Sequence, residues 1–216
     1  MATRLSREDK EMRNRALVCF FLLVTFLCGC ASAPAPRYYR VPLDLSALDS
    51  AFFRTHGQSI RVAAFRASAP LRQDSIVTYR DDCPVIEFSE NCLWESSPPS
   101  LVRQKLTEAF RVCSLFNRVE SQPGRPPAHY VLRGQILRFN HLQTSDGSYG
   151  EVGLAVEFAS REDHEILWST IVRVREKAQS DSPEAVVIAV SKALHQCIIQ
   201  IVHQVNHATA SRSKIP

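Results

Sequence analysis

An apolar run near the N-terminus constrains this chain more than any other feature. Residues 16–27 (ALVCFFLLVTFL) are apolar apart from Thr25, and the residues before them carry more Arg and Lys than Asp and Glu. A helix that crosses a bilayer core needs about 20 apolar residues, so this run is too short to span. A short apolar segment behind a positively charged flank is typical of a signal peptide.

The run ends in Leu27-Cys28-Gly29-Cys30, an order that resembles the bacterial lipobox. The resemblance implies that a diacylglyceryl group is attached to the Cys30 thiol, that the chain is cut before this residue, and that the new amine is acylated, for example with palmitate. The alternative is a helix of the folded domain that ends in cysteine. The charged flank and the Pro-rich residues 31–38 disfavour that alternative. We therefore predict a signal peptide over residues 1–29 and a lipid-anchored tether over residues 30–40.

The expected location follows from the anchor. One acyl chain holds a protein at a membrane only marginally, whereas three chains would hold it almost permanently. Ala31 follows the anchor where Asp would signal retention in the inner membrane, by resemblance to enterobacterial sorting rules. We expect the protein to be attached to the outer membrane and to face the periplasm.

Composition bounds the class of the remaining chain. Hydrophobic residues make up 45% of the sequence, which is ample for one core, and we expect a single domain over residues 41–207 with a frayed polar tail over 208–216. The formal net charge is +4, and it falls once the basic N-terminal flank is removed. Because no basic residues cluster on one predicted face, nucleic-acid binding is not expected.

Periodicity predicts six strands and two helices. Runs rich in β-branched and aromatic residues predict strands over 59–65, 75–80, 84–89, 129–139, 151–158 and 166–175. A change of phase around Gly134 predicts a β-bulge, and Asp146-Gly147 predicts a hairpin turn. Apolar residues at helical spacing predict helices over 98–115 and from 183 for about 24 residues, with Ser97 and Ser182 as caps.

These elements predict an α/β (α+β) sandwich. The last three strands form an antiparallel meander, because each is apolar on alternate residues and the connections are short. In the strand over 151–158, Val152, Leu154, Val156 and Phe158 point one way, and Glu151 and Glu157 point the other. We expect a mostly antiparallel sheet of about five or six strands with two helices packed on one face.

The cysteines beyond the anchor allow several arrangements. In an oxidising compartment Cys83, Cys92, Cys113 and Cys197 could form two bridges in three connectivities. Cys113 and Cys197 fall on the apolar faces of predicted helices, which favours buried thiols. Cys83 and Cys92 flank one short predicted strand, so a disulfide between them is a candidate.

Sequence motifs of catalysis are missing from the chain. It has no Gly-x-Ser-x-Gly, no Gly-rich phosphate loop and no His-Glu-x-x-His, and it contains seven glycines in all. Asp81-Asp82 is interpreted as a solvated hairpin turn, and His203 and His207 as exposed helix-end histidines that lack a third metal ligand. Arg72-Gln73-Asp74 could face a partner or fix a loop. We expect no enzyme activity, no cofactor and no metal.

Several stretches together resemble the ABC-type transport auxiliary lipoprotein family, the group that includes paraquat-inducible protein C. They cover about residues 37–205 in order and are RVAAFRASAPLRQDSIVTYRD from residue 61, ESSPPSLVRQKLTEAF after Trp94, LFNRV, YVLRGQILRF, GEVGLAVEF, ILWSTIV and SPEAVVIAVSKAL. Members of the family usually carry other residues where Cys83 and Cys92 stand. The resemblance therefore does not support the candidate disulfide.

The resemblance implies a docking role without chemistry. The implied partner is a protein with mammalian-cell-entry domains, and together with an ABC-type or related inner-membrane component it would move phospholipid between two membranes. Docking on a ring-shaped partner would allow several copies of this chain to assemble. The alternative is a lipoprotein that activates or scaffolds a cell-wall synthase. A tether of about ten residues reaches little more than 30 Å, which favours work close to the membrane.

The anchor prediction has a direct test. Cys30→Ser removes the thiol that carries the diacylglyceryl group, so we expect the variant to lose its membrane attachment while its domain stays folded. Cell fractionation with immunoblotting measures the attachment. A variant that stays firmly in the outer-membrane fraction would contradict the anchor.

Overall fold

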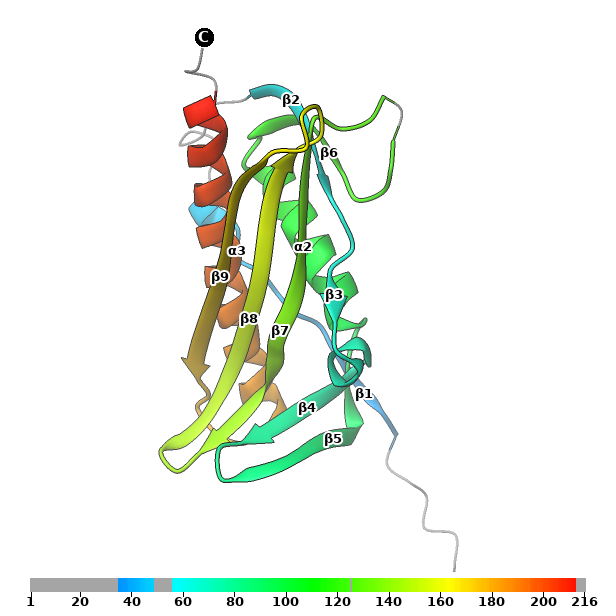
Figure 1. The fold of residues 1–216 in the computed structure, drawn as a ribbon. Helices are drawn as coiled ribbons and strands as arrows, with labels where there is room; N and C mark the ends of the chain where they lie inside the picture. The colour runs from blue at the N-terminus through cyan, green and yellow to red at the C-terminus, as the bar shows by residue number, and fades with distance from the viewer. Residues whose placement is uncertain (1–34, 49–55, 125, 213–216) are drawn as a thin grey trace, which may run out of the picture. The chain divides into compact units, whose positions relative to one another are not determined.

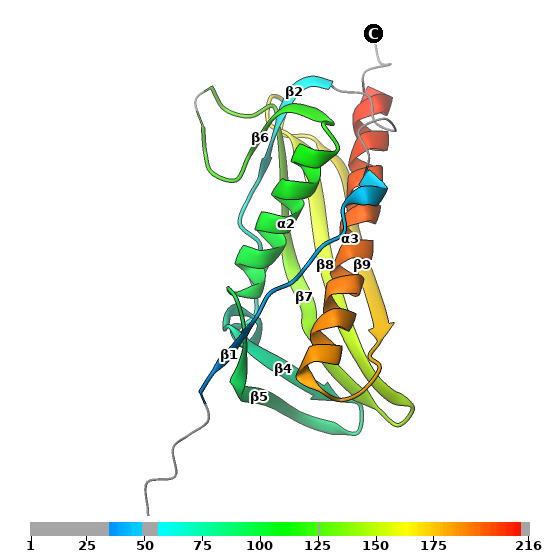
Figure 2. The same cartoon turned by 180° about the vertical axis from the view of Figure 1, so that it is seen from behind.

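The computed structural model describes residues 35–48, 56–124 and 126–212, so the predicted signal peptide and Cys30 lie outside the described residues. These residues form one mixed sheet of nine strands with two α-helices on one of its faces (Figures 1 and 2). The α+β class and the placement of the helices agree with the sequence prediction. The strand number does not agree, and the antiparallel expectation is met only in part, because the long antiparallel pairs are joined by short parallel ones.

Three long strands form the predicted antiparallel meander. They are β7 (Tyr130–Thr144), β8 (Gly147–Ser160) and β9 (Ile166–Lys177). β8 pairs antiparallel with both neighbours along nearly its whole length. The turn between β7 and β8 contains Asp146, as predicted. The register of β7 shifts between Ile136 and Arg138, so the bulge predicted around Gly134 is present a few residues further along the strand.

Gly134 has another role in the core. A Cβ atom at this position would lie 2.6 Å from the ring of Phe65, which is buried. The glycine therefore makes room for an aromatic ring that arrives from the segment between two short strands. The change of phase in β7 comes from the bulge, since Leu132 and Ile136 are buried before it and Phe139 after it.

Parallel pairs account for the mixed character of the sheet. On the other side of β7 lie, in succession, β2 (His56–Val62), β3 (Arg66–Ala67) and β4 (Ser75–Arg80), each parallel to it. β6 (Phe116–Glu120) pairs parallel with β2, and β1 (Arg37–Tyr39) pairs parallel with β5 (Cys83–Trp94). Only β4 and β5 make a further antiparallel hairpin. Short 3-10 turns lie at Ser46–Leu48 (η1) and Ala69–Arg72 (η3).

The two helices cover the same face of the sheet. α2 (Pro98–Val112) packs on β6 and β2, and α3 (Pro183–Arg212) packs on β8 and β9. The Oγ atom of Ser182 accepts a hydrogen bond from the Ala185 amide at 3.3 Å, which confirms the predicted cap. Ser97 makes no such bond, because its hydroxyl donates to Ser100 Oγ at 3.2 Å; Pro98 at the first helical position begins the helix without it.

Both ends of the folded region differ from the prediction. Residues 37–39 of the predicted tether belong to the sheet as β1. Residues 208–212 of the predicted frayed tail are helical. The last turn of α3 is held by Arg212, whose guanidinium lies 2.5 Å from Asp163 and 3.5 Å from Glu165 in the loop between β8 and β9. Charge pairing with this loop extends the helix beyond its apolar stripe.

The cysteines are all free where the structure describes them. Cys113 and Cys197 are buried in the core, as predicted. Cys83 and Cys92 lie at opposite ends of β5, and both thiols are free. β4 pairs with β5 from Arg80 opposite Cys83 to Ser75 opposite Leu93, a span of roughly 17 Å, whereas a disulfide needs Cα atoms within about 7 Å. The candidate bridge is therefore not formed, because the strand is longer than the sequence indicated.

Aromatic side chains fill the space between the sheet and the helices. Trp94 is fully buried and meets the ring of Phe139 edge-on, with centroids 5.2 Å apart. On the side of α2, Phe116 contacts Phe110 edge-on and contacts Tyr130 and Phe158 with tilted rings. Trp168 on β9 is half-buried at the margin of this core.

The two tryptophans should differ in their contribution to stability. Trp94→Ala leaves a cavity in a closed core, so we expect a loss of about 3–5 kcal/mol in the free energy of unfolding. Trp168→Ala should cost clearly less, because solvent already reaches its ring. Urea denaturation of both variants measures the difference, and equal losses would contradict this view of the core.

Candidate functional site

The face of the sheet opposite the helices is the candidate site (Figure 1). Alternation along β8 directs Val152, Leu154, Val156 and Phe158 toward the helices, where all are buried. It directs the residues between them to the other face. We name the exposed surface of β7, β8 and β9 the helix-free face.

Small and apolar side chains occupy the middle of the helix-free face. Ala155 on β8 lies opposite Gln135 on β7 and Ile171 on β9. The Ile171 side chain is 63% exposed, the largest exposure among the isoleucines of the described residues. Gly153 lies one pair further along, opposite Arg138 and Arg173. A depression of about 690 Å³ lies over Ala155 and reaches the segment around Ala63, between β2 and β3.

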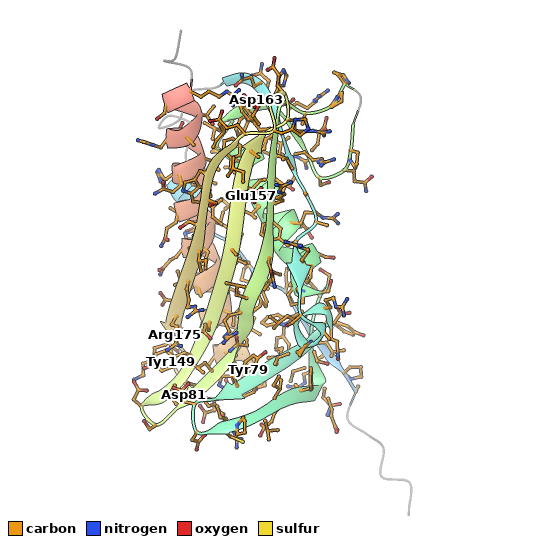
Figure 3. The ribbon with its side chains drawn as sticks, viewed as in Figure 1. Tyr79, Asp81, Tyr149, Glu157, Asp163 and Arg175 are labelled. Atoms are coloured by element: carbon orange, nitrogen blue, oxygen red, sulfur yellow. The ribbon has the colours of Figure 1, made fainter. Side chains whose placement is uncertain are left out.

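Ion pairs cross the strands on both sides of this middle. Arg133 on β7 pairs with Glu157, its direct neighbour on β8. Glu151 on β8 is only 2% exposed, and its carboxylate lies 2.9 Å from Arg175 and 3.6 Å from Arg138. Figure 3 shows Glu157 and Arg175 well apart along the meander. The cross-strand pairs stabilise the sheet and hold the arginines in place.

Glu151 holds two arginines of the helix-free face in place, Arg138 and Arg175. The hydrogen bond from Arg175 to Glu151 raises the pKa of the Arg175 guanidinium. The guanidinium carbon of Arg138 also lies 5.5 Å from the ring centroid of Tyr79 on β4. Such fixed arginines suit recognition of another surface, because their planar groups are already oriented.

A second polar cluster lies at the end of the sheet that contains the β7–β8 turn. His141 Nε2 lies 2.9 Å from Ser148 Oγ, and its Nδ1 lies 3.3 Å from Thr78 Oγ1. The Ser148 hydroxyl donates to Asp181, in the loop before α3. This order differs from that of a hydrolase triad, in which the histidine lies between the serine and the carboxylate. Ser148 donates its hydrogen bond to Asp181 and not to the histidine, so it is not an activated nucleophile. The cluster connects the loop before α3 to the β7–β8 turn.

Acidic residues line a depression beside this cluster. Asp81, Asp82 and Asp181 lie around a volume of about 570 Å³. Among the described residues, no group of three His, Cys, Asp or Glu side chains is placed to hold a metal ion. Asp81 and Asp82 form the exposed turn between β4 and β5, as the sequence indicated (Figure 3).

The other residues singled out in the sequence lie apart from the helix-free face. His203 and His207 are exposed on α3, in agreement with the prediction. Arg72 to Asp74 are exposed where η3 leads into β4, and the Asp74 carbonyl accepts the Trp94 amide at 2.6 Å. These loop residues fix a connection. Burial raises the pKa of the Cys197 thiol to about 12, which makes it an inert core residue.

Length and composition alone would permit α3 to cross a membrane, and it is the one described helix of which this is true. Its apolar residues face the sheet, however, and Val190, Leu194, Ile198 and Ile201 are fully buried. α3 is therefore the core helix of this domain.

Comparisons with known proteins identify a family model that matches this chain and solved structures that share its fold. A model of the protein family described as ABC-type transport auxiliary lipoprotein component matches residues 45–202. A search of curated proteins gave no match. Among solved structures, protein XCC0632 from Xanthomonas campestris is similar with a TM-score of 0.75 and 14% sequence identity, over 82% of this chain and 99% of that chain.

A second solved structure has the same fold at greater distance. The hypothetical protein CT253 from Chlamydia trachomatis is similar with a TM-score of 0.52 and 8% sequence identity, over 72% of this chain and 99% of that chain. At these identities the two structures show a shared fold and carry no information on partners.

The buried histidine makes stability depend on pH. Burial lowers the pKa of His141; nearby Asp181 raises it, and Arg80 lowers it further, with the lowering dominant. Above the unfolded pKa of about 6.5, the histidine is neutral in both states. Below it, the unfolded chain binds the proton more readily, so the free energy of unfolding falls as the pH falls.

Urea denaturation between about pH 7.5 and about pH 5 tests this effect, since carboxylates titrate mainly below that window. We expect His141→Gln to lose part of the pH dependence and the exposed control His207→Gln to keep it. Equal slopes for His141→Gln and the unaltered protein would contradict the assignment.

Proposed function

The chain belongs to the ABC-type transport auxiliary lipoprotein family, and on that premise we propose that it is a non-catalytic docking component of a lipid transport system. In this proposal Cys30 carries the lipid anchor in the outer membrane, and the domain faces the periplasm. The partner is a mammalian-cell-entry-domain protein, and the cargo is phospholipid that moves between the two membranes.

The exposed helix-free face is the observation that supports docking. One face of the sheet is covered by α2 and α3, while the other presents Ile171 at 63% exposure beside the small residues Gly153 and Ala155. Protein interfaces commonly have an apolar centre with a polar rim, and arginine is frequent among the residues that contribute most. Arg133 and Arg138 supply such a rim here.

The absence of catalytic geometry fits the same role. Among the described residues, Ser148 lies in contact with His141 and Asp181. Because the serine hydroxyl donates its hydrogen bond directly to the aspartate, this group has a structural role. Glu151, the most buried carboxylate on the helix-free face, is neutralised by two arginines. A docking surface needs fixed charges of this kind and no nucleophile.

Paired substitutions test the face. Ile171 and Ile188 are both exposed, at 63% and 53%, but Ile188 lies on α3, on the helix-covered side. We expect Ile171→Asp to weaken capture of the mammalian-cell-entry-domain partner about tenfold or more, because a charge enters the apolar centre of the interface. Ile188→Asp should leave capture unchanged.

Both variants should melt at the temperature of the unaltered protein, since both side chains are exposed. Affinity purification from cells that express the lipidated chain measures capture. Undiminished capture by Ile171→Asp, or equal losses in the two variants, would contradict docking through the helix-free face.

A further inference from the structure

A second apolar surface lies outside the helix-free face, on the β4–β5 hairpin. Val85, Ile86 and Phe88 follow one another closely on β5 and are 57%, 36% and 42% exposed. Tyr38 on β1 is 66% exposed. Together they make up half of the large hydrophobic side chains that the described part of the chain exposes. We name Pro84–Phe88 the β5 apolar segment.

This segment lies at the end of the domain that is closest to the anchor along the chain. β1 is hydrogen-bonded to β5, with Arg37 opposite Cys92, and β5 lies across the end of the sheet in both views (Figures 1 and 2). Arg37 follows Cys30 by a stretch of chain that can span at most about 25 Å. A lipid on Cys30 therefore keeps β1, and the β5 strand paired to it, near the membrane surface.

The arrangement of the side chains suits lipid better than a flat protein partner. Val85 and Ile86 are consecutive and both exposed, so the segment presents apolar groups on both sides of the strand. A rigid partner on one side would leave the other side in water. The interfacial layer of a bilayer is fluid and can surround both sides.

The charges nearby limit the depth of contact. Asp81 and Asp82 form the exposed turn at the tip of the hairpin, which disfavours entry tip first. Glu87 within the segment is paired with Arg80 at 3.4 Å. The outer edge of β5 beside the segment makes no strand pair among the described residues, and unpaired amides are costly in hydrocarbon. The segment therefore suits the boundary between headgroups and acyl chains.

From this placement we infer that the β5 apolar segment lies in the interfacial layer of the bilayer that holds the Cys30 lipid. The inference rests on the lipid anchor of the proposed function. It adds a second membrane contact. Two contacts fix the orientation of the domain on the membrane, and with it the direction in which the helix-free face points.

Fluorescence quenching by brominated lipid tests the contact. The lipidated full chain is reconstituted in vesicles of phosphatidylethanolamine with a minor fraction of phosphatidylglycerol, with and without bromine on the acyl chains near the headgroup. A single tryptophan is added as Phe88→Trp, and the matched control is Val112→Trp at the distant end of α2, a position of similar exposure. Native Trp94 and Trp168 give a background that the unaltered protein measures.

We expect brominated lipid to quench the added tryptophan of Phe88→Trp severalfold more than that of Val112→Trp. Equal quenching in vesicle-bound protein would overturn the inference, as would a blue-shifted Phe88→Trp emission that bromine does not quench, because a second copy or another protein would then cover the segment.

Flotation of the vesicles distinguishes a failure of the β5 membrane contact from a failure of the lipid anchor. Protein that floats with the vesicles but shows no selective quenching contradicts the contact alone. Lipidated protein that fails to float contradicts the anchor of the proposed function, and the inference falls with it. Val85→Trp repeats the comparison at a second exposed position of the segment, against the same control on α2.

Discussion

The packing of α3 against β8 and β9 is the contact on which the rest of the structure depends. It requires a close approach at Gly150, where a Cβ atom would lie 2.2 Å from the Val190 amide nitrogen. The buried stripe of α3 then covers one face of the meander, and α2 extends this cover over β2 and β6. Because Val152, Leu154, Val156 and Phe158 of β8 are directed to that face, the middle of β8 on the opposite face carries only small and charged residues.

Regular periodicity explains which parts of the fold the sequence predicts. The meander and both helices have apolar residues at one constant spacing, and the structure confirms them. β4 was predicted with its observed bounds, and β2 and β5 were predicted in part. The short strands β1, β3 and β6 and the parallel pairing could not be predicted, because they are set by distant parts of the chain. The change of phase in β7 indicates a bulge, which the structure has between Ile136 and Arg138. That Gly134 also admits Phe65 from another segment could not be predicted, because the contact joins distant parts of the chain.

The candidate site was predictable only in part. The alternation of β8 already separates Glu151 and Glu157 from the core, and the structure adds their arginine partners from β7 and β9. The role of Ile171 was not visible, because an apolar residue on a strand is exposed or buried according to which face the helices cover. The lipid anchor at Cys30, in contrast, is a local motif and remains a sequence prediction.

The central claim is that the helix-free face docks on a lipid transport partner. Photo-crosslinking in living cells tests it most directly, with a photoreactive amino acid in place of Ile171 and, as control, of Ile188, and with mass spectrometry of the captured proteins. The account predicts a mammalian-cell-entry-domain protein captured from position 171 and not from position 188. Capture of a cell-wall synthase from position 171, or of the transport partner from position 188 alone, would contradict it.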